Sequence, residues 1–192
     1  MPGDNGGTQF TFYFTDLELL RVMPSLDLQL FSSATVAQDF EKQFAGVASF
    51  DNGATFNFEN AVDPSHVYDR VGSVVSGTGY GVNVAFAAFT ALGTGFADGY
   101  TAFSAKVRKP PNGHLEVKLF GAPGGQSADS VANIDLDNYV GSKYLGNGWY
   151  DVAISFADFT NPGNIAKHSG YLIGMPGDNG GTQFTFYFTD LE

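Results

Sequence analysis

The acidic residues are the first candidates for chemistry in this sequence, because they outnumber the basic ones by 20 to 9. Hydrolysis of a polysaccharide needs two carboxyl groups about 5 to 10 Å apart, one of them with a raised pKa. Asp135 and Asp137 share a strand face with Asn133, a pattern that fits a ligand cluster but more often forms an ordinary polar face. The other acids considered for such a pair are Glu59, Asp63, Asp69 and Glu116. In so acidic a chain, the presence of such pairs does not predict hydrolysis.

The histidines, cysteines and serines provide no second catalytic signal. The histidines are His66, His114 and His168, each in or beside a predicted turn, and their spacing is not that of a zinc site. The chain has no cysteine, which excludes thiol chemistry, thiolate metal sites and disulfides. It also has no G-x-S-x-G motif. We therefore expect no enzyme activity.

The net charge limits the kinds of partner. A formal charge of −11 repels phosphate backbones and anionic membranes, so we expect neither nucleic acid nor a membrane as a partner. No stretch approaches the ~18 apolar residues of a membrane helix. Residues 1–7 have neither the basic start nor the apolar stretch of a secretion signal, so any such signal is expected outside this chain.

The elements that would position a site begin with a repeated strand. Residues 1–18 (MPGDNGGTQFTFYFTDLE) recur unchanged as residues 175–192. Within the first copy Phe10, Phe12 and Phe14 alternate with polar residues, which predicts a half-buried strand. One domain needs this strand once, so we expect one copy to complete its own domain and the other to dock on a neighbouring molecule. A tandem array, a circular permutation with overlap, and strand exchange between molecules all remain possible origins.

The rest of the chain is also rich in short strands and turns. Alternating or apolar runs occupy residues 26–31, 54–59, 82–89, 100–108, 114–120, 131–137, 149–156 and 168–174. Residues 32–44 could hold one helical turn. The turn signal Lys109-Pro110-Pro111-Asn112-Gly113 predicts a hairpin, with Val107 opposite Leu115 and Lys106 opposite Glu116. Without a long amphipathic helix, this pattern predicts one all-β domain over residues 1–192, a two-sheet antiparallel sandwich.

Four motifs occur in a recognisable order. They are Asp39-Phe40-Glu41, the Gly-rich segment 76–84 (SGTGYGVNV), residues 148–159 (GWYDVAISFADF) and the closing strand 184–192 (FTFYFTDLE). This order resembles the β-jelly-roll carbohydrate-binding modules of the galactose-binding-like type, which are attached to bacterial polysaccharide-degrading enzymes. The chain departs from that family at Leu191, or Leu17 in the first copy, where a second Asp is usual. The resemblance implies a jelly-roll topology and a secreted, extracellular protein.

The resemblance also implies a structural calcium ion, held by the Glu of the first motif and the Asp of the closing strand. These are Glu41 with Asp16 or Asp190. Because Asp16 has the parity of Phe10, Phe12 and Phe14, a regular strand would aim its carboxylate into the core, where an unpaired charge is very costly. Oxygen ligation to Ca²⁺ would satisfy that carboxylate. The alternatives are a bulge that turns the aspartate to solvent, or hydrogen bonds from backbone amides.

The resemblance directs the search for a glycan site to aromatic and planar polar side chains. Trp149, the sole tryptophan, is expected to be buried rather than to serve as a sugar platform. The candidate carbohydrate-binding residues are Tyr68, Arg70, Arg108, His114 and Tyr144. We therefore predict a non-catalytic module that recognises a polysaccharide or oligosaccharide. The alternative is a structural protein that self-assembles into homo-oligomers by exchange of the duplicated strand.

Overall fold

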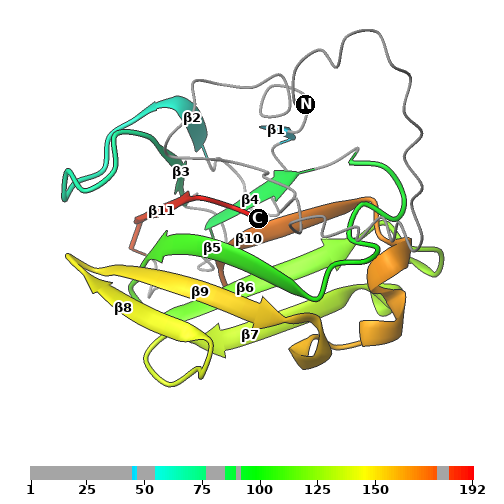
Figure 1. Ribbon diagram of the computed structural model, residues 1–192. Coiled ribbons are helices and arrows are strands. Elements are labelled where there is room, and N and C mark those ends of the chain that lie inside the picture. The colour runs from blue at the N-terminus through cyan, green and yellow to red at the C-terminus, as the bar shows by residue number, and fades with distance from the viewer. Residues whose placement is uncertain (1–44, 47–54, 77–84, 90–91, 177–181) are drawn as a thin grey trace, which may run out of the picture.

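The protein is a β-sandwich of two antiparallel sheets (Figure 1). The computed structural model describes residues 45–46, 55–76, 85–89, 92–176 and 182–192. One sheet has five strands in the order β1 (Ala45–Gly46), β4 (Ala85–Phe89), β10 (Gly170–Met175), β6 (His114–Phe120) and β7 (Ser130–Asp135). The other has six in the order β2 (Thr55–Ala61), β3 (Val71–Val75), β11 (Thr185–Thr189), β5 (Ala102–Arg108), β9 (Trp149–Ser155) and β8 (Ser142–Gly146). The predicted all-β sandwich is confirmed.

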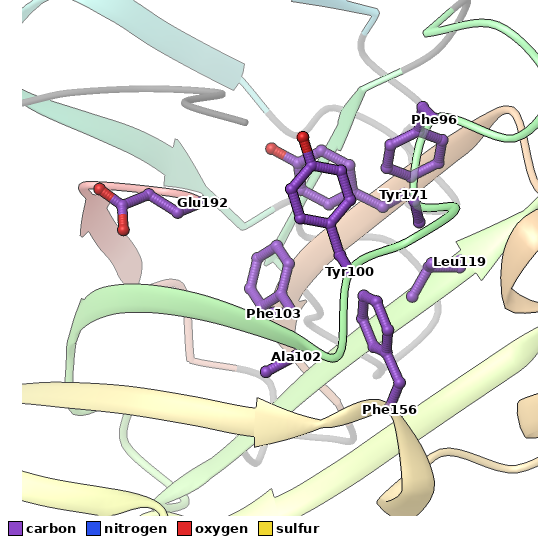
Figure 2. A pocket seen from close by; sticks show the side chains of 9 residues that line it. Phe96, Tyr100, Ala102, Phe103, Leu119, Phe156, Tyr171 and Glu192 are labelled. Carbon is purple, nitrogen blue, oxygen red and sulfur yellow. The ribbon is translucent and has the colours of Figure 1, made fainter. Parts of the chain in front are cut away.

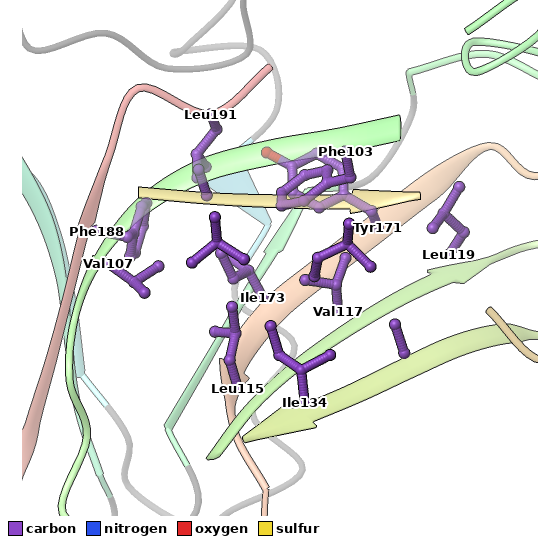
Figure 3. Packing of buried hydrophobic residues seen from close by; sticks show 14 of the residues in the cluster. Phe103, Val107, Leu115, Val117, Leu119, Ile134, Tyr171, Ile173, Phe188 and Leu191 are labelled. Atoms are coloured by element: carbon purple, nitrogen blue, oxygen red, sulfur yellow. The ribbon is translucent and has the colours of Figure 1, made fainter. Parts of the chain in front are cut away.

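The core lies between the two sheets and follows from the alternation of the strands. In β5 and β6 every second residue is buried, and these apolar side chains face each other across the sandwich. Figure 3 shows Val107 and Phe188 of one sheet pointing toward Leu115 and Ile173 of the other. Full burial of such a side chain stabilises the fold by about 1.5 to 3 kcal/mol.

The predicted hairpin between residues 100–108 and 114–120 is wrong. β5 pairs with β9 and β11, whereas β6 pairs with β10 and β7 in the other sheet. The turn therefore carries the chain from one sheet to the other: the Lys109 amide donates to Gly148 on one side, and the Gly113 carbonyl accepts from Leu136 on the other. Alternation alone does not distinguish a hairpin within one sheet from a connection between two sheets. In both arrangements the apolar faces of the two strands are directed toward the same core.

The pairs predicted across that hairpin are also absent. Lys106 lies opposite Asp151 of β9 and Thr189 of β11, while Glu116 lies opposite Asn133 of β7 and Gly174 of β10. Lys106 and Glu116 thus belong to different sheets.

Three of the described strands were missed in the sequence: the two-residue β1, β3 and β8. Four of the five residues of β3 are buried, and its sequence VGSVV shows no regular alternation of apolar and polar residues. β8 and β9 form a hairpin through Asn147 and Gly148, which both have positive φ values, 53° and 83°. Asn-Gly is the strongest short signal for a two-residue hairpin, and it was available in the sequence.

The second copy of the repeated strand is a central element of the six-stranded sheet. β11 lies between β3 and β5, and Phe186 and Phe188 are fully buried. Asp190 has a φ of 45°, and this left-handed residue interrupts the alternation, so that Thr189 and Leu191 on either side of it are both buried.

The helices of the described residues are three short 3-10 turns, η1 (Gly125–Ala128), η2 (Phe156–Asp158) and η3 (Pro162–Lys167). In this part of the chain, none is both long and apolar enough to cross a membrane. The predictions for residues 8–16, 26–31 and 32–44 lie outside the described residues, as does most of the Gly-rich segment 76–84.

Candidate functional site

Trp149 anchors a loop against the outer face of the six-stranded sheet. It is fully buried, as predicted, yet it lies outside the main core cluster and has the parity of the exposed Asp151 on β9. The loop of residues 62–70 covers it. The Trp149 Nε1 donates to Ser65 Oγ at 2.9 Å, and the Tyr68 ring meets the indole edge-on, 4.8 Å between centroids. The loop thereby converts an outward-facing indole into a buried support.

Asp63 fixes the shape of this loop. Its Oδ1 accepts from the amide and the hydroxyl of Ser65 at 2.9 and 2.6 Å, and its Oδ2 accepts from the amides of Val67 and Tyr68 at 2.7 and 3.0 Å. Trp149 Nε1 adds a fifth contact at 3.3 Å. Burial by itself raises the pKa of Asp63, but these hydrogen bonds outweigh it and lower the pKa. Asp63 is therefore a structural carboxylate rather than a general acid.

Two tyrosine rings lie beside two cations on the same face. The Lys106 Nζ is 5.8 Å from the centroid of the Tyr68 ring, and the guanidinium of Arg108 is 6.0 Å from that of Tyr187. Arg108 lies opposite Trp149 in the register of β5 and β9. The Lys106–Tyr68 pair and the Arg108–Tyr187 pair therefore both lie around the indole. We call Tyr68, Lys106, Arg108, Tyr187 and Asp190 the outer-face cluster.

Asp190 belongs to this cluster through an ion pair. Its Oδ2 lies 2.5 Å from the Lys106 Nζ, and only 17% of its side chain is exposed. Burial of the ammonium lowers the pKa of Lys106, but the hydrogen bond and the charge of Asp190 more than offset it, so the pKa is raised. The left-handed turn aims Asp190 outward, which is the alternative to core burial that the sequence left open.

In the described residues, the Asp190 carboxylate is paired with the Lys106 ammonium group. Among the described residues, no three histidine, aspartate or glutamate side chains are grouped so as to hold a metal ion. Glu41 and Asp16, the other predicted ligands, lie outside the described residues.

The five predicted sugar-binding residues fall in different places. Tyr68 and Arg108 come together in the outer-face cluster, and Arg70, just before β3, binds the Thr189 hydroxyl through its carbonyl at 3.1 Å. His114 is exposed at the start of β6, in the other sheet, opposite Asp135. Tyr144 lies on the edge strand β8 and is 59% exposed. Arg108 on β5 and His114 on β6 therefore lie in different sheets.

Tyr144 takes part in a second cluster of similar composition. Its ring is 5.1 Å from that of Tyr150, whose hydroxyl donates to Asp137 Oδ1 at 2.6 Å, and Lys109 pairs with Asp137 Oδ2. The hydrogen bonds from Lys109 and Tyr150 hold the pKa of Asp137 below its usual range. We call Tyr144, Tyr150, Asp137 and Lys109 the edge cluster.

Sequence reasoning missed Lys106, Tyr187 and Asp190 as members of one site. Lys106 had been assigned to Glu116 through the wrong hairpin. Tyr187 carried a usable signal, because Tyr13 and Tyr187 occupy the polar face of the repeated strand, where an aromatic ring has no core to join.

An apolar pocket lies between the sheets near one end of the sandwich. Tyr100, Phe103, Phe156 and Tyr171 are among the side chains that line it (Figure 2). Only about 30 Å³ is open to the centre of a water molecule, space for a water or two rather than for a sugar. A wider hollow of about 450 Å³ adjoins it, between residues 97–101 and the turns η2 and η3. Asp98 is the only side chain with a planar polar group among the residues that line this hollow.

Among the described carboxylates with shifted pKa values, the shift is downward at three and upward only at Glu116. The amide of Asn138 and the backbone of Asp137 hydrogen-bond to Asp135 and hold its pKa low, as hydrogen bonds do at Asp63 and Asp137. Burial raises the pKa of Glu116, partly opposed by Lys118, and this residue lies on β6 in the other sheet from the outer-face cluster. Hydrolysis of a glycoside requires a carboxyl group of raised pKa beside an ionised one, and Glu116 is the one carboxyl group of raised pKa among these four.

Comparison with known protein families and with curated protein sequences finds no match to this chain.

Proposed function

We propose that this protein is a non-catalytic carbohydrate-binding module whose outer-face cluster contacts a polysaccharide or oligosaccharide. The observation that carries the proposal is the pairing of two half-buried tyrosine rings with two cations around a buried tryptophan. The finer assignment, a jelly roll of the galactose-binding-like type in a secreted protein, belongs to the same proposal and rests on the order of the four motifs.

The chemistry of the cluster suits a sugar. Aromatic rings offer an apolar face to the C–H side of a pyranoside, as they do to other apolar surfaces, and the guanidinium of Arg108 presents several donors in one plane to its hydroxyls. Asp63 and Trp149 hold Tyr68 in position before any ligand arrives, which lowers the entropy lost on binding. The Arg108 Nε is buried and has no hydrogen-bond partner among the described residues.

The proposed absence of catalysis follows from how the carboxylates are used. Asp63 organises a loop, while Asp190 and Asp137 pair with lysines. Calcium remains a prediction that rests on Glu41 with Asp16 or Asp190; its test is whether a chelator lowers the melting temperature. At a free calcium concentration 100 times the dissociation constant, binding would add ~2.7 kcal/mol of stability.

A glycan array followed by titration tests the function. The full chain is compared with Arg108→Gln, which keeps a polar side chain but shortens it and removes the charge and the fork of donors. We expect retained melting temperature and about tenfold weaker binding, the loss of roughly one charge-assisted hydrogen bond.

Tyr144→Ala and Tyr100→Ala serve as controls, because they truncate exposed rings at the edge cluster and at the hollow. Both should bind as the unmodified chain does. Loss of binding in either control with retention in Arg108→Gln would place the glycan elsewhere, and no binding to any glycan would refute the function.

A further inference from the structure

β11 fills a defined slot in the six-stranded sheet. Residues Thr185 to Phe188 pair with β3, and Phe188 and Thr189 pair with β5. Beyond the strand, Glu192 and Ser104 exchange two backbone hydrogen bonds of 2.9 and 3.0 Å. At the other end, the Gln183 side chain donates to the Ser76 carbonyl and the Phe184 amide donates to the Ser76 hydroxyl.

The walls of the slot are shaped for the rings of this strand. Phe186 and Phe188 are fully buried and stack at 5.8 Å between centroids. Gly72 of β3 lies directly against the second ring, since a Cβ at this position would be 2.5 Å from the ring of Phe188. Figure 3 shows Phe188 and Leu191 directed into the core beside Val107. A segment with these aromatic residues at this spacing is therefore what the slot selects.

The chain contains a second segment that meets this description in full. Residues 8–18 are identical to residues 182–192, so that Phe12 corresponds to Phe186 and Phe14 to Phe188. Each side-chain and backbone contact that residues 182–192 make in the slot is thus available to residues 8–18.

We infer that the slot between β3 and β5 is a binding site for either copy of the repeated strand, and that residues 8–18 of the same chain are its second occupant. The linker permits this exchange. Residues 19–44 separate the first copy from β1, and 26 extended residues span about 85 Å. The radius of gyration expected for a compact domain of this length is only about 16 Å.

Counting strands and slots favours exchange within one chain over exchange between chains. Every molecule has one slot and two copies, so any number of molecules leaves one copy per molecule outside a slot. Exchange between molecules therefore gains no contact in the slot and adds the entropic cost of association. A tethered copy instead acts at an effective concentration in the millimolar range. Docking on a neighbouring molecule, as predicted from the sequence, lacks this advantage.

Charge substitutions in the full chain test the inference. Phe186→Asp with Phe188→Asp disables the second copy, and Phe12→Asp with Phe14→Asp is the matched change in the first. We expect both double variants to fold as monomers with melting temperatures close to that of the unmodified chain. The variant with all four substitutions should unfold, because no copy can then fill the slot.

A disulfide identifies the occupant, because the chain has no native cysteine. Ser73 lies opposite Tyr187. In the Phe186→Asp, Phe188→Asp chain, Ser73→Cys with Tyr13→Cys should oxidise to an intramolecular cross-link. The inference is overturned if the Phe186→Asp, Phe188→Asp variant unfolds like the fourfold variant, or if it folds only as a concentration-dependent oligomer. It is also overturned if the cross-link between the two cysteines does not form, or if the fourfold variant stays folded.

Discussion

The outer-face cluster and the edge cluster are built from the same kinds of residue but rest on different supports. Each has an aromatic pair beside a lysine and an aspartate: Tyr68 with Trp149 in one, and Tyr144 with Tyr150 in the other. In the outer-face cluster, Tyr68 is half-buried and lies over the fully buried indole of Trp149. In the edge cluster the tyrosine is 59% exposed on the last strand of the sheet.

The ion pairs show the same contrast. Side-chain exposure is 30% and 17% for Lys106 and Asp190, against 36% and 49% for Lys109 and Asp137. Water and salt screen the second pair more strongly, so its contribution to stability is smaller. The comparison teaches that the support beneath a cluster, rather than its composition, determines how firmly its side chains are held.

The largest expected effect comes from removing the support of the outer-face cluster. Asp63→Ala leaves the donors of Ser65, Val67 and Tyr68 without their acceptor, and an unsatisfied buried donor costs about 1 to 3 kcal/mol. With partial relaxation of the loop, we expect a loss of about 3 kcal/mol, or a melting temperature about 10 °C lower. Thermal unfolding followed by circular dichroism measures it.

Asp137→Ala is the matched control, since it also removes an acceptor from a lysine and an aromatic cluster. Its partners can turn to water, so its melting temperature should fall much less. Equal losses in the two variants would show that the loop of residues 62–70 is not a support.

A smaller effect is expected from acid. The pKa of Asp63 is lower in the folded protein than its ordinary value of 3.8. Its contribution to stability is therefore complete well above pH 3.8 and is lost as the pH falls through the folded-state pKa. Unfolding by denaturant between pH 2 and 5 should show stability that declines with acid, and Asp63→Asn should decline less steeply.

Glu116 should change stability with pH in the opposite direction to Asp63. Burial raises its pKa, so its ionised form destabilises the fold at neutral pH and protonation relieves this cost as the pH falls through the raised value. Glu116→Gln should therefore be more stable than the unmodified chain at pH 7.

For the Asp63 prediction, a steeper loss of stability with acid in Asp63→Asn than in the unmodified chain would contradict the assignment to Asp63.

The smallest effect should come from the two ion pairs. A double-mutant cycle with Lys106→Met and Asp190→Asn is compared with a cycle of Lys109→Met and Asp137→Asn. Phe12→Asp and Phe14→Asp are present in every chain, so that the first copy cannot replace the second in the slot. We expect a coupling free energy of about 1 kcal/mol for the first pair and less for the second, both weakened by salt. A larger coupling at Lys109 would reverse the ranking of the two clusters.

Parts of the fold were predictable because local patterns carry them. The alternation of residues 100–108 and 114–120 identifies β5, β6 and their buried faces, and residues 149–156 identify β9. Hydrophobic period and burial are linked by the geometry of a strand, so they need no knowledge of its neighbours. β8 could also have been found from Asn147-Gly148, whereas the sequence of β3, VGSVV, has no period to reveal it.

The candidate site was predictable only in part, since it depends on which strands are neighbours. Tyr68 and Arg108 were selected for their side chains, but the sequence paired Lys106 with Glu116 rather than with Asp190, 84 positions away. The outward turn at Asp190 depends on a single left-handed residue that strand parity does not reveal.

By itself, the sequence determined the class of fold, the strands with a clear period and the presence of two identical segments at residues 1–18 and 175–192. Tertiary structure decided which sheet each strand joins, that Asp63 closes a loop over the indole, and that β11 lies between β3 and β5. The physical reason is range. Period, turn chemistry and composition act between residues close in the chain, whereas ion pairs, loop anchors and strand neighbours join residues far apart, and the packing of the whole sandwich selects among them.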